Sequence, residues 1–504
     1  MRSPFRATGS SALRGLVLLG AVALQSCHDD SDSPLGGNNF PVPARLGGLA
    51  PVEGSDLLDD SFAAAGVFET YDFVERLPIR VVVDRLSRPS IVGVGVRPRG
   101  LRVERLTEAG TNDATFGTDG LFLLPDEPGT GTFTLGAADC QLDAFDRILL
   151  FSTRTTIGDA QRAVVVRLDP DGVLDPSYGD QGRVVIEPTP GATETLAVSL
   201  GADPHGGVMA CATELWPEGP RMILVRIDES GALDATFGEG GVAHGPEDEA
   251  SLGVRAVSDA AGRVVVAGTL PIEPGRAALW RFDADGSLDP GFGVDGLVTQ
   301  SGDAGLGVAA VDVATDAAGR IVLLGQRSRD LREIDAWPSQ LVDFKTDAPP
   351  VFDAIVWRFL PDGSRDPGFD SGGASVLAFS GPYYPVTGGL AGGDHFDAAA
   401  GLFLDDAGRI VIAGWSDPGS WETNIGWATF GPTRPFLVRL DSSGALDPDF
   451  HGVGHAQLGW DYNGGTNVFP RGHPTAVTRD ARGRWLLAGG SVGGSSQRVW
   501  RVVP

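Results

Sequence analysis

The stretch that decides the fold is residues 281–296, RFDADGSLDPGFGVDG, because its pattern recurs seven times along the chain. In each copy an aspartate is followed three residues later by an aromatic residue and seven residues later by a glycine. The aspartates are Asp59, Asp113, Asp175, Asp234, Asp289, Asp366 and Asp447. The aromatic residues are Phe62, Phe116, Tyr178, Phe237, Phe292, Phe369 and Phe450. Recurrence at a fixed spacing indicates a repeat architecture with one supersecondary unit per copy.

An arginine stands eight residues before six of these aspartates, at the end of an apolar segment. These arginines are Arg105, Arg167, Arg226, Arg281, Arg358 and Arg439, and Arg501 ends the corresponding segment near the C-terminus. Turn signals such as Pro170-Asp171-Gly172 lie between arginine and aspartate, which predicts a hairpin. The two side chains then face each other across the hairpin, so we expect a structural ion pair in each unit.

A second phrase precedes each hairpin, as in Ala261-Gly262-Arg263 before VVVAG and Ala407-Gly408-Arg409 before IVIAG. Each unit is therefore predicted to hold four short strands, of which the fourth is the LDxxFG phrase itself. Such a unit is one blade of a β-propeller. The first copy, Leu58 to Phe68, supplies only a fourth strand, and the chain ends on a third strand at Arg501. We therefore predict an all-β, seven-bladed propeller of antiparallel four-stranded blades, closed by the N-terminal strand joining the three C-terminal strands.

These phrases closely resemble the delta-60 repeat, a bacterial propeller-type repeat of secreted and surface proteins. The resemblance covers the chain from about residue 55 onward. It implies the propeller fold, and it implies no particular activity.

Composition restricts the partners. The chain has 504 residues, with 66 acidic and 39 basic side chains, which gives a net charge of −27. Nucleic acid is an unsuitable partner because binding phosphate requires a basic surface. We expect a monomer without a cofactor or metal ion. The aspartates in DPDGVLD and DADGSLD are typical of calcium ligands, but these turns lack the remaining oxygen ligands of a calcium loop.

The N-terminus is predicted to be a targeting segment. Arg2, Arg6 and Arg14 precede a short apolar run that ends at Leu24-Gln25-Ser26-Cys27. The run is too short to span a bilayer and is typical of a signal peptide. Its end resembles a bacterial lipobox, which implies lipidation of Cys27 and a place in the outer membrane, on its periplasmic side or at the cell surface. The predicted divisions are a signal peptide at 1–27, a flexible tether at 28–49 and one propeller at 50–504.

Two further cysteines, Cys140 and Cys211, fall on strands of neighbouring units. Blades pack about 10 Å apart, whereas a disulfide requires Cα atoms about 4.4 to 6.8 Å apart. We therefore expect two buried free thiols.

Long insertions occur only in connections that share one face of the ring, at about 326–353, 379–395, 415–434 and 459–474. Their aromatic and histidine residues are candidate binding residues: Trp337, Tyr383, Tyr384, His395, Trp415, Trp421, Trp427, Trp460, Tyr462 and His473. Aromatic rings beside polar groups suit recognition of a glycan or a protein. The alternative interpretation is that these rings pack the long loops onto the ring.

Signatures of catalysis are absent from the sequence: it contains no GxSxG, no HExxH and no paired CxxC. A metal held by His395 and His473 with Asp394 or Asp461 is an alternative that requires the loops on both sides of blade 6 to converge. We therefore assign no catalytic residue. Three function classes stay open at this point: a binding or scaffold module, a glycan lyase or hydrolase using the same face, and a structural spacer.

Overall fold

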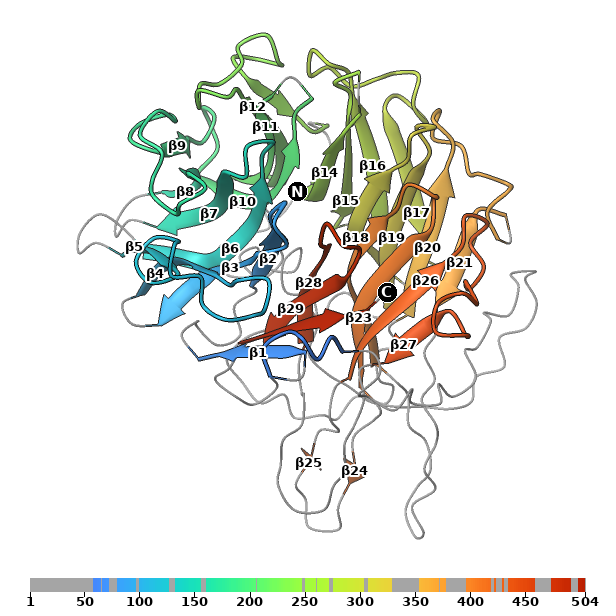
Figure 1. Cartoon of the computed structure of the whole chain (residues 1–504). Coiled ribbons are helices and arrows are strands. Elements are labelled where there is room, and N and C mark those ends of the chain that lie inside the picture. Colours follow the sequence, from blue (N-terminus) through green and yellow to red (C-terminus); the bar gives the residue numbers. More distant parts are fainter. Residues whose placement is uncertain are drawn as a thin grey trace.

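In the computed structural model the chain forms a ring of seven four-stranded antiparallel sheets, which we number blades 1 to 7 (Figure 1). Between Leu58 and Val503 the structure describes all residues except 65, 72–78, 97–98, 127–131, 156–159, 205, 247–249, 260, 272–274, 303–306, 329–352, 371, 378–395, 418–420, 423–427, 430–433, 458–472 and 491–496. No helix among these residues is long and apolar enough to cross a membrane. The predicted seven-bladed, all-β fold is therefore confirmed.

Within a blade the strands pair in sequence order, and the first strand lies nearest the centre of the ring. Blade 1 has β2 (Arg80–Val83), β3 (Pro89–Val96), β4 (Arg99–Arg105) and β5 (Leu121–Pro125). Blade 2 has β6 (Thr132–Leu142), β7 (Ile148–Thr155), β8 (Gln161–Leu168) and β9 (Arg183–Ile186). Blade 3 has β10 (Glu194–Ala202), β11 (Val208–Trp216), β12 (Gly219–Ile227) and β13 (Val242–His244).

The next three blades repeat this order. Blade 4 has β14 (Leu252–Ser258), β15 (Val264–Leu270), β16 (Arg276–Phe282) and β17 (Leu297–Ser301). Blade 5 has β18 (Gly307–Thr315), β19 (Ile321–Ser328), β20 (Asp353–Phe359) and β21 (Ala374–Leu377). Blade 6 has β22 (Phe396–Leu404), β23 (Ile410–Asp417), β26 (Arg434–Leu440) and β27 (His455–Gln457), and a small ladder of β24 (Trp421–Glu422) and β25 (Ala428–Thr429) lies between β23 and β26 in sequence.

Blade 7 is built from both ends of the ring. β28 (His473–Arg479), β29 (Trp485–Gly490) and β30 (Gln497–Val502) pair in sequence order, and β1 (Val67–Thr70) adds to β30 with Val67 opposite Trp500. Leu58 forms an isolated bridge with Val502, and the Asp59 N–H donates to the Arg501 carbonyl. The blue strand β1 lies along the red strands in Figure 1.

One expectation about the strands was wrong. The LDxxFG phrase does not form the fourth strand; it forms the connection before that strand, and in blade 1 the strand begins at Leu121, after the Asp113 to Gly120 segment. The physical reason is that the Asp113 carboxylate accepts hydrogen bonds from the Thr115 N–H and hydroxyl. This side chain-to-backbone bonding favours a turn over an extended strand.

The hydrophobic core is divided into layers between neighbouring blades. Alternate residues of a strand point to opposite faces of its sheet, so every blade contributes to two layers. Between blades 3 and 4, for example, Met222 and Trp280 share one buried cluster, and both side chains are fully buried.

The two free cysteines point into different layers of the core. Cys140 faces blade 1 and Cys211 faces blade 4, so both are buried and unbridged as expected. Burial raises the pKa of the Cys211 thiol to about 12.

Candidate functional site

The repeated arginines and aspartates lie on one face of the ring, at the turns that join strands one to two and three to four of each blade. We call this the turn face. In six blades the third-strand arginine forms the ion pair expected from the spacing, and in blade 7 Arg501 pairs with Asp59 from the other end of the ring. The nitrogen-to-oxygen distances, in chain order of the arginines from Arg105 to Arg501, are 2.8, 2.9, 3.4, 2.7, 2.7, 2.6 and 2.9 Å. Each guanidinium also lies 4.1 to 4.8 Å from the centre of its blade's aromatic ring.

The longest of these pairs has a local cause. Arg226 in blade 3 lies 3.4 Å from Asp234 because it also binds Asp203 at 3.0 Å. In the other blades the aspartate equivalent to Asp203 binds an arginine four residues later in the chain, as Asp259 binds Arg263. Gly207 replaces that arginine in blade 3, so the aspartate takes the third-strand arginine as its partner.

Among the residues that the structure describes, the same arginines join neighbouring blades at six junctions. Each arginine donates to a backbone carbonyl in the turn of the next blade. The residue that follows the aromatic residue donates its N–H to the carbonyl of the next residue in that same turn. The guanidinium contacts are Arg105 to Pro170, Arg167 to Glu229, Arg226 to Ala284, Arg281 to Pro361, Arg358 to Ser442 and Arg501 to Glu108. The amide contacts are Gly117 to Asp171, Gly179 to Ser230, Gly238 to Asp285, Gly293 to Asp362, Asp370 to Ser443 and Ala63 to Ala109.

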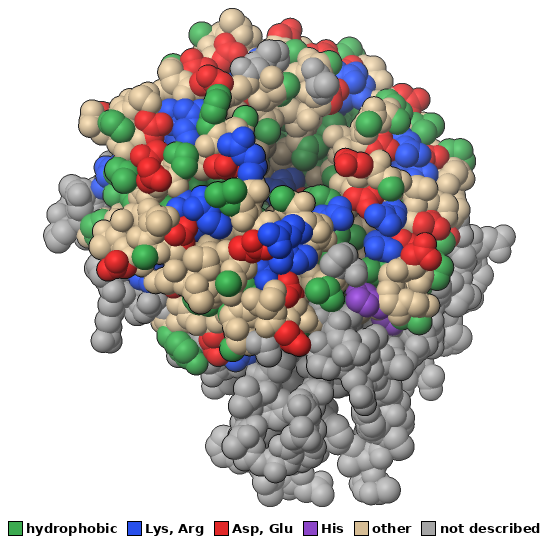
Figure 2. Space-filling model, in the orientation of Figure 1, with side chains coloured by type: hydrophobic (Ala, Val, Ile, Leu, Met, Phe, Trp, Pro, Cys, Tyr) green, Lys and Arg blue, Asp and Glu red, His purple; other side chains and the backbone are tan. Residues whose placement is uncertain are grey.

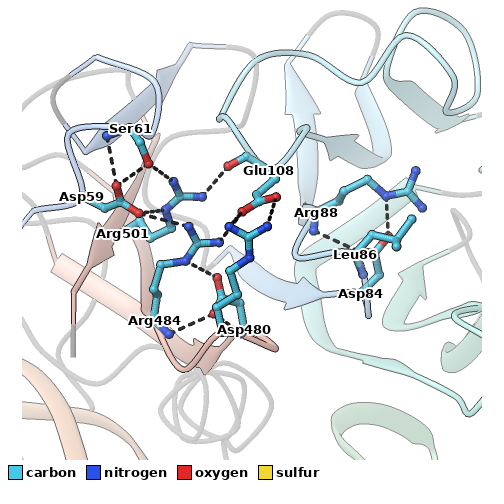
Figure 3. Close-up of polar contacts among 10 residues, drawn as sticks. Asp59, Ser61, Asp84, Leu86, Arg88, Glu108, Asp480, Arg484 and Arg501 are labelled. Carbon is cyan, nitrogen blue, oxygen red and sulfur yellow. Dashed lines mark hydrogen bonds and ion pairs between the residues drawn. The ribbon is translucent and has the colours of Figure 1, made fainter.

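Figure 3 shows the junction of blades 7 and 1, where the two ends of the ring meet. Asp59 lies 2.9 Å from Arg501 and 3.2 Å from Arg484, and Glu108 of blade 1 lies 3.1 Å from Arg484. Asp59 also accepts from the Ser61 N–H at 3.0 Å. Every charged group in this cluster has an opposite partner within the ring, so the cluster holds blades together and leaves no free charge for a ligand.

The repeated aspartates are occupied by hydrogen bonds within the protein. Their oxygens accept hydrogen bonds from serine, threonine and arginine side chains, and no group of three or more His, Cys, Asp or Glu in the described part of the chain could hold a metal ion.

These carboxylates predict how stability depends on pH. Burial raises the pKa of Asp113, but bonds from Thr115 and Arg105 outweigh burial and leave that pKa lowered. In Asp228 and Asp234 the hydroxyls of Ser230 and Thr236 lower the pKa. A lowered pKa in the folded state stabilises the fold above the unfolded value, about 3.9, and this contribution is lost as the pH falls.

We therefore expect a melting temperature that changes little between about pH 5 and 8 and falls steeply below about pH 4. Thermal unfolding followed by circular dichroism across that range tests this. Asp113→Asn should make the acid fall shallower, whereas Asp60→Asn, which removes an exposed carboxylate of the same face, serves as the control. A melting temperature that stays constant down to pH 3 contradicts the prediction.

A second polar cluster occupies the central channel, and it was not predicted from the sequence. Figure 2 shows a hollow at the middle of one face, with a basic side chain visible on its floor. In the innermost strands Asp139, Arg255 and Asp312 follow β-bulges. Arg255 of blade 4 reaches Asp139 of blade 2 at 2.5 Å and Asp312 of blade 5 at 3.2 Å. We call these residues, together with Arg80, the channel network.

The channel network reaches every blade. Asp139 accepts from the Leu200 N–H of blade 3, and Asp312 accepts from the Leu402 N–H of blade 6, both at 2.9 Å. Arg80 of blade 1 lies 3.9 Å from Asp139 and donates to the Thr475 carbonyl of blade 7 at 3.1 Å. Burial lowers the pKa of Arg80, whereas the neighbouring Asp139 raises the pKa of Arg255. Two arginines are thus balanced by two aspartates, and the network braces the ring.

Most of the predicted binding residues lie outside the described residues. This applies to Trp337, Tyr383, Tyr384, His395, Trp427, Trp460 and Tyr462. The backbone of Trp421 is in β24 and that of His473 is in β28, without described side chains. Trp415, in β23 opposite Pro435, is only 4% exposed, so its ring offers no surface to a ligand. Apart from the buried Trp415, the predicted binding residues therefore stay a prediction.

The described histidines do not form a catalytic group either. His244 lies in β13 of blade 3, while His451 and His455 lie near the outer strand of blade 6. Burial lowers the pKa of both His451 and His455, and Arg439 adds to the effect on His451.

Comparison with known proteins supports a β-propeller family. A family described as "Domain of unknown function (DUF5122) beta-propeller" matches residues 146–178, 262–292 and 408–450. These segments are three copies of the turn-face repeat. A search of curated proteins finds no match.

Solved structures with detectable similarity have different activities. The polysaccharide lyase Uly1 is 11% identical, with a TM-score of 0.48 over 86% of this chain and 92% of that one. The Penicillium chrysogenum alpha-L-arabinanase complexed with arabinobiose is 9% identical, with a TM-score of 0.38 over 73% and 92%. The Nup133 β-propeller domain of Vanderwaltozyma polyspora is 7% identical, with a TM-score of 0.39 over 86% and 97%. Similarities at this level do not identify a function.

Proposed function

We propose that this chain is an exported, lipid-anchored β-propeller that acts as a binding or scaffold module. Its recognition face carries the long connections of blades 5 to 7, and its ligand is a glycan or a protein of the cell envelope or surface. The repeat resembles the delta-60 repeat of secreted and surface proteins, which agrees with this setting. We expect a monomer that contacts the membrane through its lipid only, and no nucleic acid as partner.

The observation that carries the proposal is where the long connections begin and end. They join β19 to β20, β21 to β22, β23 to β26 and β27 to β28. In an antiparallel blade these connections all open on the face opposite the turn face, which we call the insertion face. The same connections of blade 3 are short, since β11 ends at Trp216 and β12 begins at Gly219. One side of a constant ring thus bears all the variable length, as binding loops on a rigid scaffold do.

An enzyme is the alternative, as a glycan lyase or hydrolase acting at the insertion face. Such an enzyme needs an acid and a base within hydrogen-bonding reach of one substrate atom. The carboxylates of the channel network do not meet this need, because Asp139 and Asp312 are both held by arginine and backbone N–H groups. We therefore favour binding over catalysis.

Export and anchoring are proposed from the N-terminal sequence. The apolar run before Cys27 fits a signal peptide, and the following tether leads to Leu58 at blade 7. Metabolic labelling with a palmitate analogue tests the anchor. Label in the wild type and none in Cys27→Ala is expected, whereas equal labelling of the two proteins would contradict lipidation at this residue.

The recognition face is tested with a glycan and envelope-polymer array. We would compare the Cys27→Ala protein with a triple variant, Trp421→Ala, Trp427→Ala and Trp460→Ala. The matched control is Leu86→Ala with Phe145→Ala, which removes apolar side chains that are 64% and 60% exposed on the turn face. Binding lost in the triple variant and kept in the control is expected. Binding that is kept in the triple variant contradicts the assignment of the recognition site to the insertion face. If none of the proteins binds anything on the array, the result favours a structural spacer.

Trp415 is excluded from that variant because its role is structural. Trp415→Ala should lower the free energy of unfolding by about 3–5 kcal/mol, since it removes a buried ring and leaves a cavity. Chemical denaturation measures this. An unchanged unfolding midpoint would show that the ring does not contribute to the core of blade 6.

A further inference from the structure

One strand pair at the insertion face places two arginines directly opposite each other. In blade 2, Arg154 of β7 is opposite Arg162 of β8, and both residues lie within two positions of the strand ends at that face. An arginine side chain does not lose its proton in a protein, so the pair carries two positive charges. Like charges directly opposite each other destabilise an antiparallel strand pair. Blade 2 therefore carries an electrostatic cost at this position.

The other blades show which residues this position holds elsewhere in the ring. The equivalent pairs are Gly95 with Gly100 in blade 1, Glu214 with Arg221 in blade 3, Leu270 with Arg276 in blade 4, Arg327 with Asp353 in blade 5 and Ser416 with Arg434 in blade 6. Each of these pairs is uncharged, has one charge, or has charges of opposite sign. Among the blades whose pair the structure describes, only blade 2 has arginine on both strands. The repeat does not require the second arginine, so its presence is a feature of this blade alone.

Both arginines face blade 1. Ile148 and Leu150 alternate with Arg154 along β7, they pack in the layer between blades 1 and 2, and the register of β7 with β8 has no bulge. Alternation therefore turns the two arginines toward blade 1, whose strands lie beside those of blade 2 in Figure 1. At the same end of blade 1, Arg99 of β4 lies 3.4 Å from Asp126. We call Arg154, Arg162 and Arg99 the arginine site.

Two of the three arginines have carboxylate partners. Glu187 lies 2.5 Å from Arg162, and Asp126 binds Arg99. Arg154 is the exception: among the described residues its guanidinium has no ion pair and no hydrogen bond, although the side chain is partly buried and its Nε atom is fully buried. A buried donor without an acceptor costs free energy, and a charged donor costs more. The uncompensated charge of the arginine site is therefore that of Arg154.

An anionic group is the ligand that this arrangement can accept. A guanidinium presents its donors in a planar fork, which binds a carboxylate or a phosphate through two parallel hydrogen bonds. The chain as a whole has a net charge of −27 and repels anions, so any affinity for an anion has to come from a local group of arginines. A neutral sugar would leave the charge of Arg154 uncompensated.

We propose that the arginine site binds the anionic group of an envelope polymer, a uronic-acid carboxylate or a phosphate diester, with Arg154 as the residue that contacts it. The site adds blades 1 and 2 to the insertion face, and it makes the ligand acidic. The proposal rests on the proposed function for the polymer only, because binding of an anionic group at Arg154 requires neither the aromatic residues of blades 5 to 7 nor the lipid.

The first experiment is a calorimetric titration of the full-length Cys27→Ala protein. The ligands are a uronic-acid oligosaccharide, a poly(glycerol phosphate) and a neutral oligosaccharide of the same length. We expect one of the two acidic ligands to bind, which identifies the source of the anionic group, and Arg154→Leu to weaken this binding roughly ten- to hundredfold. Failure of both acidic ligands to bind, equal binding of the neutral one, or unchanged binding by Arg154→Leu would each overturn the proposal.

The matched control is Arg276→Leu in blade 4. Arg276 has the strand position of Arg162 at the same face, but an apolar residue, Leu270, is opposite it. This variant should bind the acidic ligand as the unsubstituted protein does. Equal weakening by Arg276→Leu and Arg154→Leu would show that the ligand responds to the total charge of the protein, and it would overturn the arginine site.

The second experiment compares melting temperatures, with Arg154→Glu as a second variant. This substitution recreates the glutamate–arginine pair of blade 3, Glu214 with Arg221. Without ligand Arg154→Glu should melt higher than the unsubstituted protein, because attraction replaces repulsion between the two strands. The acidic ligand should raise the melting temperature of the unsubstituted protein and leave that of Arg154→Glu unchanged. A lower melting temperature for ligand-free Arg154→Glu would show that Arg154 already has a stabilising partner, and it would overturn the proposal.

Failure of this proposal and failure of the proposed function give different results. If the aromatic residues take no part in binding, the variant with Trp421, Trp427 and Trp460 replaced by alanine binds the acidic ligand as tightly as the unsubstituted protein does. If the arginine site takes no part, Arg154→Leu binds it as tightly. The first result leaves the arginine site in place, and the second overturns it.

Discussion

Deletion of residues 58–70 is expected to prevent the ring from folding stably. The deletion removes β1 and therefore exposes the edge of β30, which invites pairing with other chains. It also removes Phe62, which is fully buried between blades 7 and 1 and whose loss alone costs about 3–5 kcal/mol. Arg501, only 1% exposed, would lose Asp59, and an unpaired buried charge costs a further amount of about 3–5 kcal/mol.

Circular dichroism and light scattering during heating measure this effect. The control is deletion of residues 30–49, which removes all but two residues of the predicted tether and leaves every described contact in place. We expect the control to melt like the wild type and the 58–70 deletion to aggregate or to lack a cooperative transition. A 58–70 deletion with a normal melting temperature would show that blade 7 does not need its fourth strand.

The ion pairs of the turn face could be predicted because arginine and aspartate recur at a spacing of eight residues across a turn. The bonds between blades could not, because the acceptors are backbone carbonyls of Pro170, Glu229 and their equivalents, and any residue can supply a carbonyl. The side chains on these carbonyls differ from blade to blade. The sequence therefore shows the donor of each junction but not its acceptor.

The strand assignment was wrong at the LDxxFG phrase because the aspartate of the phrase closes a turn. Leu174 and Tyr178 suggest one side of a strand, but Asp175 accepts from the Ser177 N–H and hydroxyl and closes a turn between them. The Asp-x-Ser or Asp-x-Thr pattern was the available signal, since a short polar side chain that bonds to the next backbone groups competes with a strand.

The channel network was missed because its members are single charges in strands far apart in sequence. Asp139, Arg255 and Asp312 each stand alone in an apolar segment, and the repeat places them in blades 2, 4 and 5. Only the curvature of the ring brings Arg255 to Asp139 across the intervening blade. A charge within an innermost strand could have been noted as unusual, but its partner could not have been chosen. The aromatic residues of the insertion face, apart from the buried Trp415, stay a prediction.

The channel network leads to the second large prediction. Asp139→Ala should lower the free energy of unfolding by about 3–5 kcal/mol, because it leaves Arg255 and Arg80 without a shared carboxylate. It also removes the acceptor of the Leu200 N–H, which is buried between blades 2 and 3. Urea denaturation followed by tryptophan fluorescence measures the change.

Ser199→Ala is the matched control, because Ser199 follows the bulge of blade 3 as Asp139 does that of blade 2. Its hydroxyl accepts from the Ala256 N–H at 3.3 Å without any ion pair, so its loss should cost only about 1 kcal/mol. Adding Arg255→Met to Asp139→Ala should cost less than Arg255→Met costs in the wild type, since in Asp139→Ala the arginine has already lost one of its two carboxylate partners and keeps only Asp312. If the double variant is less stable than Asp139→Ala by the full cost of Arg255→Met alone, the two residues act independently and the network does not brace the ring.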